Sequence, residues 1–376
     1  MNITLLNIEF HLFELPLLVL LSIAFINIII SEGLVIKLCT SKPLSLFLFG
    51  FSLFLTAIIA SSLFAIKPII TVKAFLKWTE VLLLTLLVFF YIRDQKSFKK
   101  IYWLLFASMF GYSIISLYWL LTGRLAEYGF RMPGGYDSLF ALSLIIPFIK
   151  KKTLIFYLVS IIVITNIFFS FSRGAWLGLI LLLAYLMKYF YTQNRKRTII
   201  GLVLMSVVFI AVTSENITEL ISWRWNTSFD AENASNIERT GLLRVAFQAF
   251  LSSPLFGIGA LNYPIFLKNT SDLYIMRAEV LDTLTPHNFF LEVLSELGLF
   301  GFTALVILLC SIYLAVSNRD HTENSFKDLH FREGLLLLFF TFLYSVSLGF
   351  ISGGYRFYMA LLFGMALSLT RIGESE

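Results

Sequence analysis

Long apolar segments recur along this chain, and each is close to the length that an α-helix needs to cross a lipid bilayer. The ~30 Å hydrocarbon core requires about 20 mostly apolar residues in a helix. Hydrophobic residues make up 58% of the chain and charged residues only 14%, a balance that excludes a soluble globular protein. The best candidates are 13–31, 44–66, 74–92, 101–122, 138–149, 153–171, 174–192, 198–213, 288–317, 334–352 and 355–370. The pattern predicts an all-α polytopic membrane protein with about 11 (range about 10–12) transmembrane helices.

Clusters of Lys and Arg between these segments predict their orientation. The clusters lie at 93–100, 150–152, 188–197 and 319–332. Because cytoplasmic loops are enriched in basic residues, we place all four clusters and the C-terminus in the cytoplasm. The N-terminus then lies outside for eleven helices and inside for twelve. The predicted parts are an N-terminal membrane bundle over 1–213, a long outer loop over 214–286 between the eighth and ninth spans, and C-terminal membrane helices over 287–376.

The outer loop is predicted to be partly helical. Ser235-Asn-Ile-Glu238 fits a capping box that begins a helix, and Ser252-Ser253-Pro254 is expected to end it. Between them, Leu243, Phe247 and Phe250 recur at close to helical spacing and fall near one stripe of this helix.

A second helix start at the end of the loop carries the first candidate for chemistry, His287. Thr285 fits an N-cap and Pro286 the first helical position, which places His287 in the first turn. There the positive end of the helix macrodipole disfavours imidazolium. A neutral imidazole can accept a proton from a hydroxyl group. The alternative is a histidine that only caps or packs at the membrane interface.

Arginines on the outer face form the second group of candidates. Arg173 follows Ser172 in a tight Ser-Arg-Gly connection between apolar segments. A guanidinium there is expected to line a cavity or bind an anion, or alternatively to snorkel and end a helix. Arg239 and Arg244 lie on the predicted loop helix, where they could bind phosphate or belong to a solvated, salt-bridged face. Arg131, in an earlier outer loop, would extend a basic lining.

No metal or cofactor site is predicted. The sequence contains no HExxH motif, no Cys/His spacing typical of zinc sites and no nucleotide-binding loop. We therefore expect no metal and no cofactor. A membrane enzyme without motifs for ATP or sugar nucleotides needs a donor substrate that is already activated.

Three stretches resemble the O-antigen ligase/polymerase superfamily of bacterial inner-membrane glycosyltransferases. They are Ser172–Gly178, then Arg239–Tyr263 with its Ser-Pro-Leu-Phe-Gly-Ile-Gly segment, and His287–Glu292 followed by Glu296, Gly298 and Gly301. The chain departs from the family at Leu243, where members often have Trp, and at 131–137, where they often have an Asn-rich turn.

The resemblance implies an inverting, metal-independent transfer in the periplasm, into which the long loop would project from the inner membrane. The donor would be a glycan on undecaprenyl diphosphate, and the acceptor lipid A–core or a glycan repeat unit. His287 would act as general base, while Arg173 and Arg239 would hold the diphosphate. The remaining residues implied by the resemblance are Arg244 as a further phosphate contact and Asn288, Arg131 and Ser172 in support.

The leading interpretation is an O-antigen ligase, and the alternative is an O-antigen or other polysaccharide polymerase, which needs the same diphosphate contacts and base. A lipid-linked oligosaccharide flippase would require charges through several spans, whereas Lys77 and Glu80 are the main pair here. A purely structural scaffold leaves the outer basic residues unexplained. Membrane lipids are further expected partners, nucleic acid is not, and the sequence indicates no protein partner.

Overall fold

The structure, a computed structural model, describes residues 2–5, 8–11, 19–23, 26, 41–122, 134–147, 153–193, 222, 226, 234–270, 284–317, 329–348 and 353–372. Within these ranges the chain is helical apart from one antiparallel hairpin, which pairs β1 (Asn2–Leu5) with β2 (Ile8–His11). Sequence analysis did not predict this hairpin. The predicted span 198–213, most of 13–31 and the candidate Arg131 lie outside the described residues.

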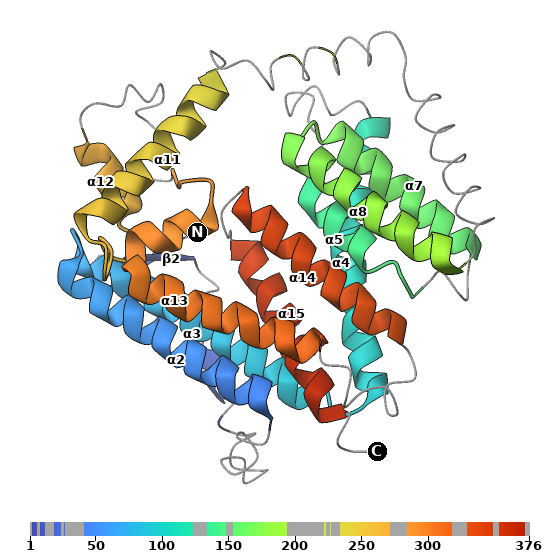
Figure 1. Cartoon of the computed structure of the whole chain (residues 1–376), viewed down its shortest axis with the longest axis horizontal. Helices are drawn as coiled ribbons and strands as arrows, with labels where there is room; N and C mark the ends of the chain where they lie inside the picture. The colour runs from blue at the N-terminus through green and yellow to red at the C-terminus, as the bar shows by residue number, and fades with distance from the viewer. Residues whose placement is uncertain are drawn as a thin grey trace. The chain divides into compact units, whose positions relative to one another are not determined.

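The described helices overlap the nine other predicted spans and the predicted loop helix (Figure 1). They are α2 (Lys42–Ser61) with the short 3-10 turn η2 (Ser62–Phe64), α3 (Pro68–Tyr91), α4 (Gln95–Leu121), α5 (Gly135–Ser143), α7 (Thr153–Phe169), α8 (Arg173–Gln193), α11 (Ala234–Ser252), α12 (Tyr263–Asn269), α13 (Phe289–Ser317), α14 (Leu329–Ser347) and α15 (Gly353–Ile372).

Among the residues that the structure describes, four helical segments are long and apolar enough to cross a membrane: 42–64, 68–91, 95–119 and 289–317. α5 has only nine residues, well short of the ~20 that a span requires. The fold is therefore that of an all-α membrane protein, as predicted. The count of about 11 spans and the side on which each loop lies remain predictions.

The chain divides into two compact units. The first comprises Met1–Ile101, Glu238–Lys327 and Val346–Glu376, and the second Tyr102–Ile237 and Asp328–Ser345. The three parts predicted from the sequence are defined by their position in or outside the membrane. The two compact units do not test them, and the three-part division remains a prediction.

In the first unit, α13 packs along α2 and α15 packs along α3, and Figure 1 shows α2, α3 and α13 side by side. An aromatic cluster joins them. The ring of Trp78 on α3 meets Phe54 of α2 edge to face, with centroids 4.8 Å apart, and lies 6.2 Å from Phe289 at the start of α13. Such contacts hold helices together where lipid and protein interiors are equally apolar.

The segment after α11 is joined to a break in α13. Gly298 has φ 64° and ψ −165°, which interrupts the helix. Four backbone hydrogen bonds cross between the two segments: Ile258 N–H to Ser295 O (3.1 Å), Gly259 N–H to Glu296 O (3.0 Å), Leu299 N–H to Pro254 O (2.8 Å) and Phe300 N–H to Leu255 O (3.1 Å). The loop therefore supplies partners for backbone groups that the broken helix leaves without their usual ones.

Glycine is required on both sides of this contact. A Cβ on Gly257 would overlap the carbonyl group of Glu296, and a Cβ on Gly298 would overlap that of Leu255. Both glycines also have positive φ, 70° and 64°, a conformation that side chains disfavour. Gly257 of the second sequence stretch and Gly298 of the third are thus explained by one close approach of two backbones.

We predict that Gly257→Ala destabilises the protein by roughly 3 kcal/mol or more, because the new Cβ meets backbone and the φ is strained. Thermal unfolding of the full chain in nanodiscs measures this. Gly111→Ala on α4 is the matched control, since a Cβ there meets nothing within 4 Å. It should be neutral, or stabilising by up to ~1 kcal/mol. Equal stability of the two variants would contradict the packing argument.

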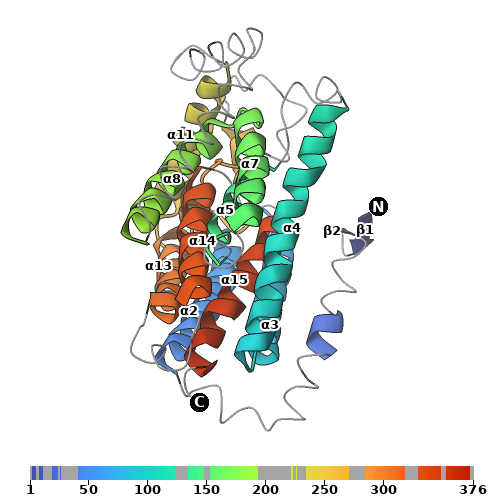
Figure 2. The same cartoon turned by 90° about the vertical axis from the view of Figure 1, so that its right-hand side faces the viewer.

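In the second unit, α5, α7 and α8 pack together, and they are seen together in Figure 2. Buried polar side chains link the helices. Ser138 on α5 lies 2.6 Å from Ser113 of α4 and accepts a 2.6 Å hydrogen bond from the amide of Asn166 on α7. Ser143 of α5 lies 2.8 Å from Thr341 of α14. Side-chain hydrogen bonds of this kind favour specific helix pairing in membranes.

Candidate active site

The loop helix α11 ends at Ser252, as predicted, but begins at Ala234, ahead of the predicted capping box. The apolar stripe of Leu243, Phe247 and Phe250 is not the buried face of the helix. Leu243 and Phe247 are 38% and 52% exposed, and the buried face consists of Leu242, Val245, Ala246 and Ala249. Apolar residues surround most of this helix, so spacing alone could not identify the buried side. The partners in tertiary structure decided it.

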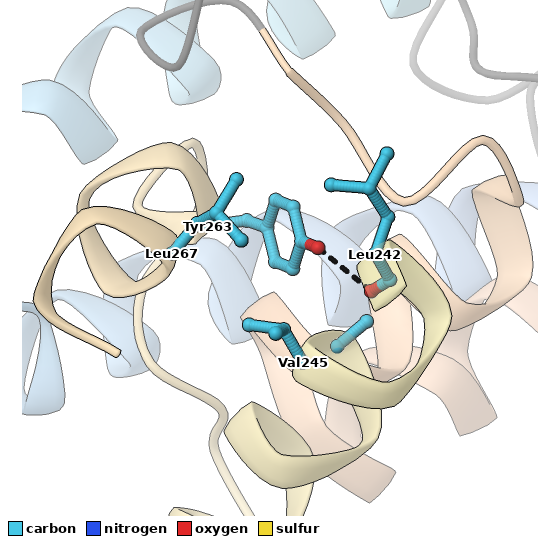
Figure 3. Packing of buried hydrophobic residues seen from close by; sticks show 5 residues of the cluster. Leu242, Val245, Tyr263 and Leu267 are labelled. Carbon is cyan, nitrogen blue, oxygen red and sulfur yellow. Dashed lines mark hydrogen bonds between the residues drawn. The ribbon is translucent and has the colours of Figure 1, made fainter. Parts of the chain in front are cut away.

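Those partners come from α12, which follows the glycine-rich loop. Tyr263 is buried, packs on Leu242 and Val245 together with Leu267, and donates its O–H to the Leu242 carbonyl at 2.7 Å (Figure 3). Burial raises the pKa of Tyr263, and the nearby Glu292 and Glu296 raise it further. The phenol therefore stays protonated and remains a donor that fixes α12 to α11.

Glu296 on α13 holds the same loop from the other side. Its carboxylate accepts the backbone N–H of Leu261 at 2.7 Å and that of Tyr263 at 3.1 Å. Next to them, the side-chain oxygen of Asn262 accepts the backbone N–H of Lys67, just before α3, at 2.7 Å. Sequence analysis included Glu296 and Asn262 in its motifs without a role for either. The sequence signal that could have indicated a role for Glu296 is a carboxylate within an otherwise apolar helix.

His287 lies directly before α13, not within it. The helix begins at Phe289, and Asn288 is its N-cap: the Asn288 side chain accepts the backbone N–H of Leu291 at 2.9 Å, and its carbonyl accepts that of Glu292 at 2.9 Å. The prediction of Thr285 as N-cap, Pro286 at the first helical position and His287 in the first turn is therefore wrong. Asn is a stronger N-cap residue than Thr, which explains why the helix begins after Asn288 and not after Thr285.

His287 is half-buried and lies within electrostatic range of two residues at the start of α11. Burial lowers the pKa of His287 and the positive charge of Arg239 lowers it further, while Glu238 acts in the opposite direction. A neutral imidazole was predicted and the direction agrees, but the main cause is burial and not the helix macrodipole. The structure thus brings together the predicted base and one of the predicted phosphate contacts.

Arg239 and Arg244 are both exposed on α11. Five residues apart on one helix, they project about 140° apart around its axis. Arg239 is the one that acts on His287, and Arg244 points to a different side of the helix. The structure therefore does not join the two as one pair of phosphate contacts.

Ser172 and Arg173 belong to the second unit, at the connection between α7 and α8. Ser172 caps α8, because its side-chain oxygen accepts the backbone N–H of Ala175 at 3.3 Å. Arg173 is the first residue of α8, so its cation lies at the positive end of the helix macrodipole. A cation and a helix N-terminus that coincide both favour a bound anion. The indole of Trp176 donates to the Phe168 carbonyl at 3.0 Å and steadies the turn.

Backbone strain marks all three sequence stretches. In the described part of the chain, the non-glycine residues with positive φ are Phe171 (47°), Leu261 (59°) and His287 (53°). Each lies within or next to one of the three stretches. Such conformations cost about 1–3 kcal/mol each and concentrate at functional sites. No local sequence signal predicts them for Phe, Leu or His.

Residues 158–306 match the family model described as O-antigen ligase. This match supports the superfamily inferred from the three stretches. The match contains all the candidate residues except Arg131, which precedes it. No curated protein matches the chain. The apolar helices and this match together support a membrane protein that carries an O-antigen ligase-type domain.

Asn288→Ala is predicted to destabilise the start of α13 by about 1 kcal/mol, because an N–H of the first turn loses its acceptor. Asn288→Asp should retain the stability, since Asp caps equally well and its charge favours a helix N-terminus. Hydrogen exchange of the amides of 291–293 reports the effect locally. Equal exchange rates in both variants would refute the capping role.

The charges around His287 predict opposite shifts in its titration. Arg239→Gln removes a nearby cation, so the pKa of His287 should rise, and Glu238→Gln removes an anion, so it should fall. The C2–H chemical shift of His287 in selectively labelled protein, followed against pH, measures both. Shifts in the same direction for the two variants would contradict this arrangement.

Proposed function

We propose that the protein is an inverting glycosyltransferase that moves a glycan from undecaprenyl diphosphate to a sugar hydroxyl of an acceptor, at the periplasmic face of the inner membrane. The observation that carries this proposal is the pairing of a half-buried His287 of lowered pKa with Arg239, inside an O-antigen ligase domain. A neutral imidazole beside a guanidinium provides a base and a phosphate ligand together.

In the proposed reaction, a ring nitrogen of His287 accepts the proton of the acceptor hydroxyl while the hydroxyl oxygen attacks the anomeric carbon of the donor glycan. The bond between that carbon and the phosphate oxygen breaks on the opposite side, which inverts the configuration. Undecaprenyl diphosphate leaves with the electron pair. Arg239 stabilises the negative charge that develops on it, and the same cation favours loss of the proton from His287 afterwards.

Arg173 and the N-terminus of α8 are proposed as the second group of diphosphate contacts, with Ser172 fixing the helix start. Arg244 and Asn288 are supporting residues, Asn288 through its cap on α13. Arg131 is kept as a proposed support. In the described part of the chain no group of three His, Cys, Asp or Glu could hold a metal ion. Metal independence is a proposal that EDTA tests directly.

An O-antigen ligase with lipid A–core as acceptor is the first candidate, and a polysaccharide polymerase is the second. Purified protein in nanodiscs, given an undecaprenyl-diphosphate glycan with and without lipid A–core, separates them. Product that forms only with lipid A–core identifies a ligase, and longer lipid-linked glycans from donor alone identify a polymerase. If neither product forms, the proposed transfer is overturned.

In the same assay His287→Ala should lower kcat by at least ~10²-fold, the usual contribution of a general base, with donor binding retained. Arg173→Ala should weaken donor handling, and Arg173→Lys should restore it only in part, since ammonium lacks the bidentate fork of guanidinium. Lys268→Ala, a change of an exposed cation on α12, is the matched control and should leave kcat unchanged. Full activity of His287→Ala would remove it as the base, and activity lost to EDTA would show a metal requirement.

A further inference from the structure

A cavity of about 150 Å³ in the first unit contains an unusual set of side chains for a membrane protein. Its lining includes Lys77 and Trp78 of α3, Glu292 and Glu296 of α13 and Arg356 of α15. Ionisable residues are expensive within apolar helices, and where they line a cavity they commonly mark a substrate path. The sequence shows Lys77 as a charge within a span and places Glu292 and Glu296 in the third stretch, but only the tertiary structure brings them together with Trp78 and Arg356.

The cavity lies beside the proposed base. Phe289 and Glu292, which form the first turn of α13, line it, and His287 precedes Phe289 by two residues. At about 1.5 Å of helix rise per residue, Glu292 and Glu296 lie roughly 5 and 10 Å beyond the start of α13. The cavity lining therefore runs from the first turn of α13, two residues after His287, into the body of the unit.

Glu292 points to a ligand for this cavity. Within the described residues, one of its carboxylate oxygens is buried and has no hydrogen-bond partner. Glu296, by contrast, already accepts two backbone N–H groups. A buried acceptor without a donor costs about 1–3 kcal/mol or more, so an occupant with a hydroxyl or amide donor is favoured there.

The lining chemistry selects one class of occupant. The lining pairs two acidic side chains, Glu292 and Glu296, with two basic ones, Lys77 and Arg356, so it is not a purely basic site of the kind that favours a phosphate group. Four ionisable residues also oppose a lipid chain. A sugar ring fits both demands: its hydroxyls donate to Glu292 and accept from Lys77 or Arg356, and its apolar C–H face can lie on Trp78. At about 150 Å³, the cavity is smaller than the ~300–1,000 Å³ that drug-sized ligands occupy, which favours a single ring.

We propose that this cavity binds one sugar ring of the glycan substrates, with Glu292 as the hydrogen-bond acceptor and Trp78 as the apolar platform. Whether this ring belongs to the donor or to the acceptor rests on the proposed function, whereas the binding of a sugar ring does not. Arg356 and Lys77 act as specificity residues that accept or reject ring substituents.

Binding can be measured without turnover. Saturation-transfer difference NMR of the full chain in nanodiscs, with the methyl glycosides of glucose, galactose and N-acetylglucosamine as probes, should show transfer to ring protons. Glu292→Gln should weaken binding roughly tenfold, because one of the two carboxyl oxygens is replaced by an amide N–H₂ group that cannot accept a hydrogen bond. Ala74→Leu fills the cavity from α3 and should abolish binding without removing any polar group. Glu333→Gln on α14, a half-buried carboxylate outside the cavity, should bind as the wild type does.

The outcomes separate this proposal from the proposed transfer. No glycoside signal, an equal signal in all four proteins, or binding of inorganic pyrophosphate in place of sugars would overturn the sugar site, even if the transfer assay succeeds. Glycoside binding that Ala74→Leu abolishes would support it, even if transfer fails. Where transfer is observed, a raised KM for the acceptor in Glu292→Gln assigns the ring to the acceptor, and a raised KM for the donor assigns it to the donor. Both constants unchanged would again overturn the proposal.

Discussion

The interruption of α13 at Gly298 is the constraint on which the rest of the first unit depends. A helix that breaks within an apolar environment leaves backbone N–H and C=O groups that must find partners nearby, since lipid supplies none. The segment 253–263 supplies them, through four backbone hydrogen bonds and the N–H groups that Glu296 accepts. The break therefore fixes the loop, and the loop fixes α12 through Tyr263 and thereby α11.

This chain of contacts explains why the candidate base and its cation come from segments almost fifty residues apart. Arg239 is near the start of α11, and α11 is held by Tyr263 and by the glycine-rich loop. His287 leads into α13, which carries the other half of the contact. Any change that separates the segment 253–263 from the interruption of α13 should therefore also separate Arg239 from His287. Neither of these two residues takes part in the backbone hydrogen bonds of that contact.

Much of the fold followed from apolar periodicity alone. Each described stretch long enough to form a span became a helix, because in an apolar environment the helix is the local way to satisfy backbone groups. The faces of α11 did not follow, since Leu243 and Phe247 are as apolar as the residues that are buried. The start of α13 did not follow either, because Thr285 and Asn288 both fit an N-cap and only the backbone shows which one is used.

The sequence by itself determined that this is a helical protein with apolar segments, and it singled out His287, Arg173 and Arg239 as candidate site residues. Side-chain identity and spacing are properties of the chain, so they can be seen before folding. The tertiary structure alone decided which of them interact and what lowers the pKa of His287. It also gathered Lys77, Trp78, Glu292 and Arg356 around one cavity. These residues come from three helices, and no local pattern relates residues whose proximity depends on how separate helices pack.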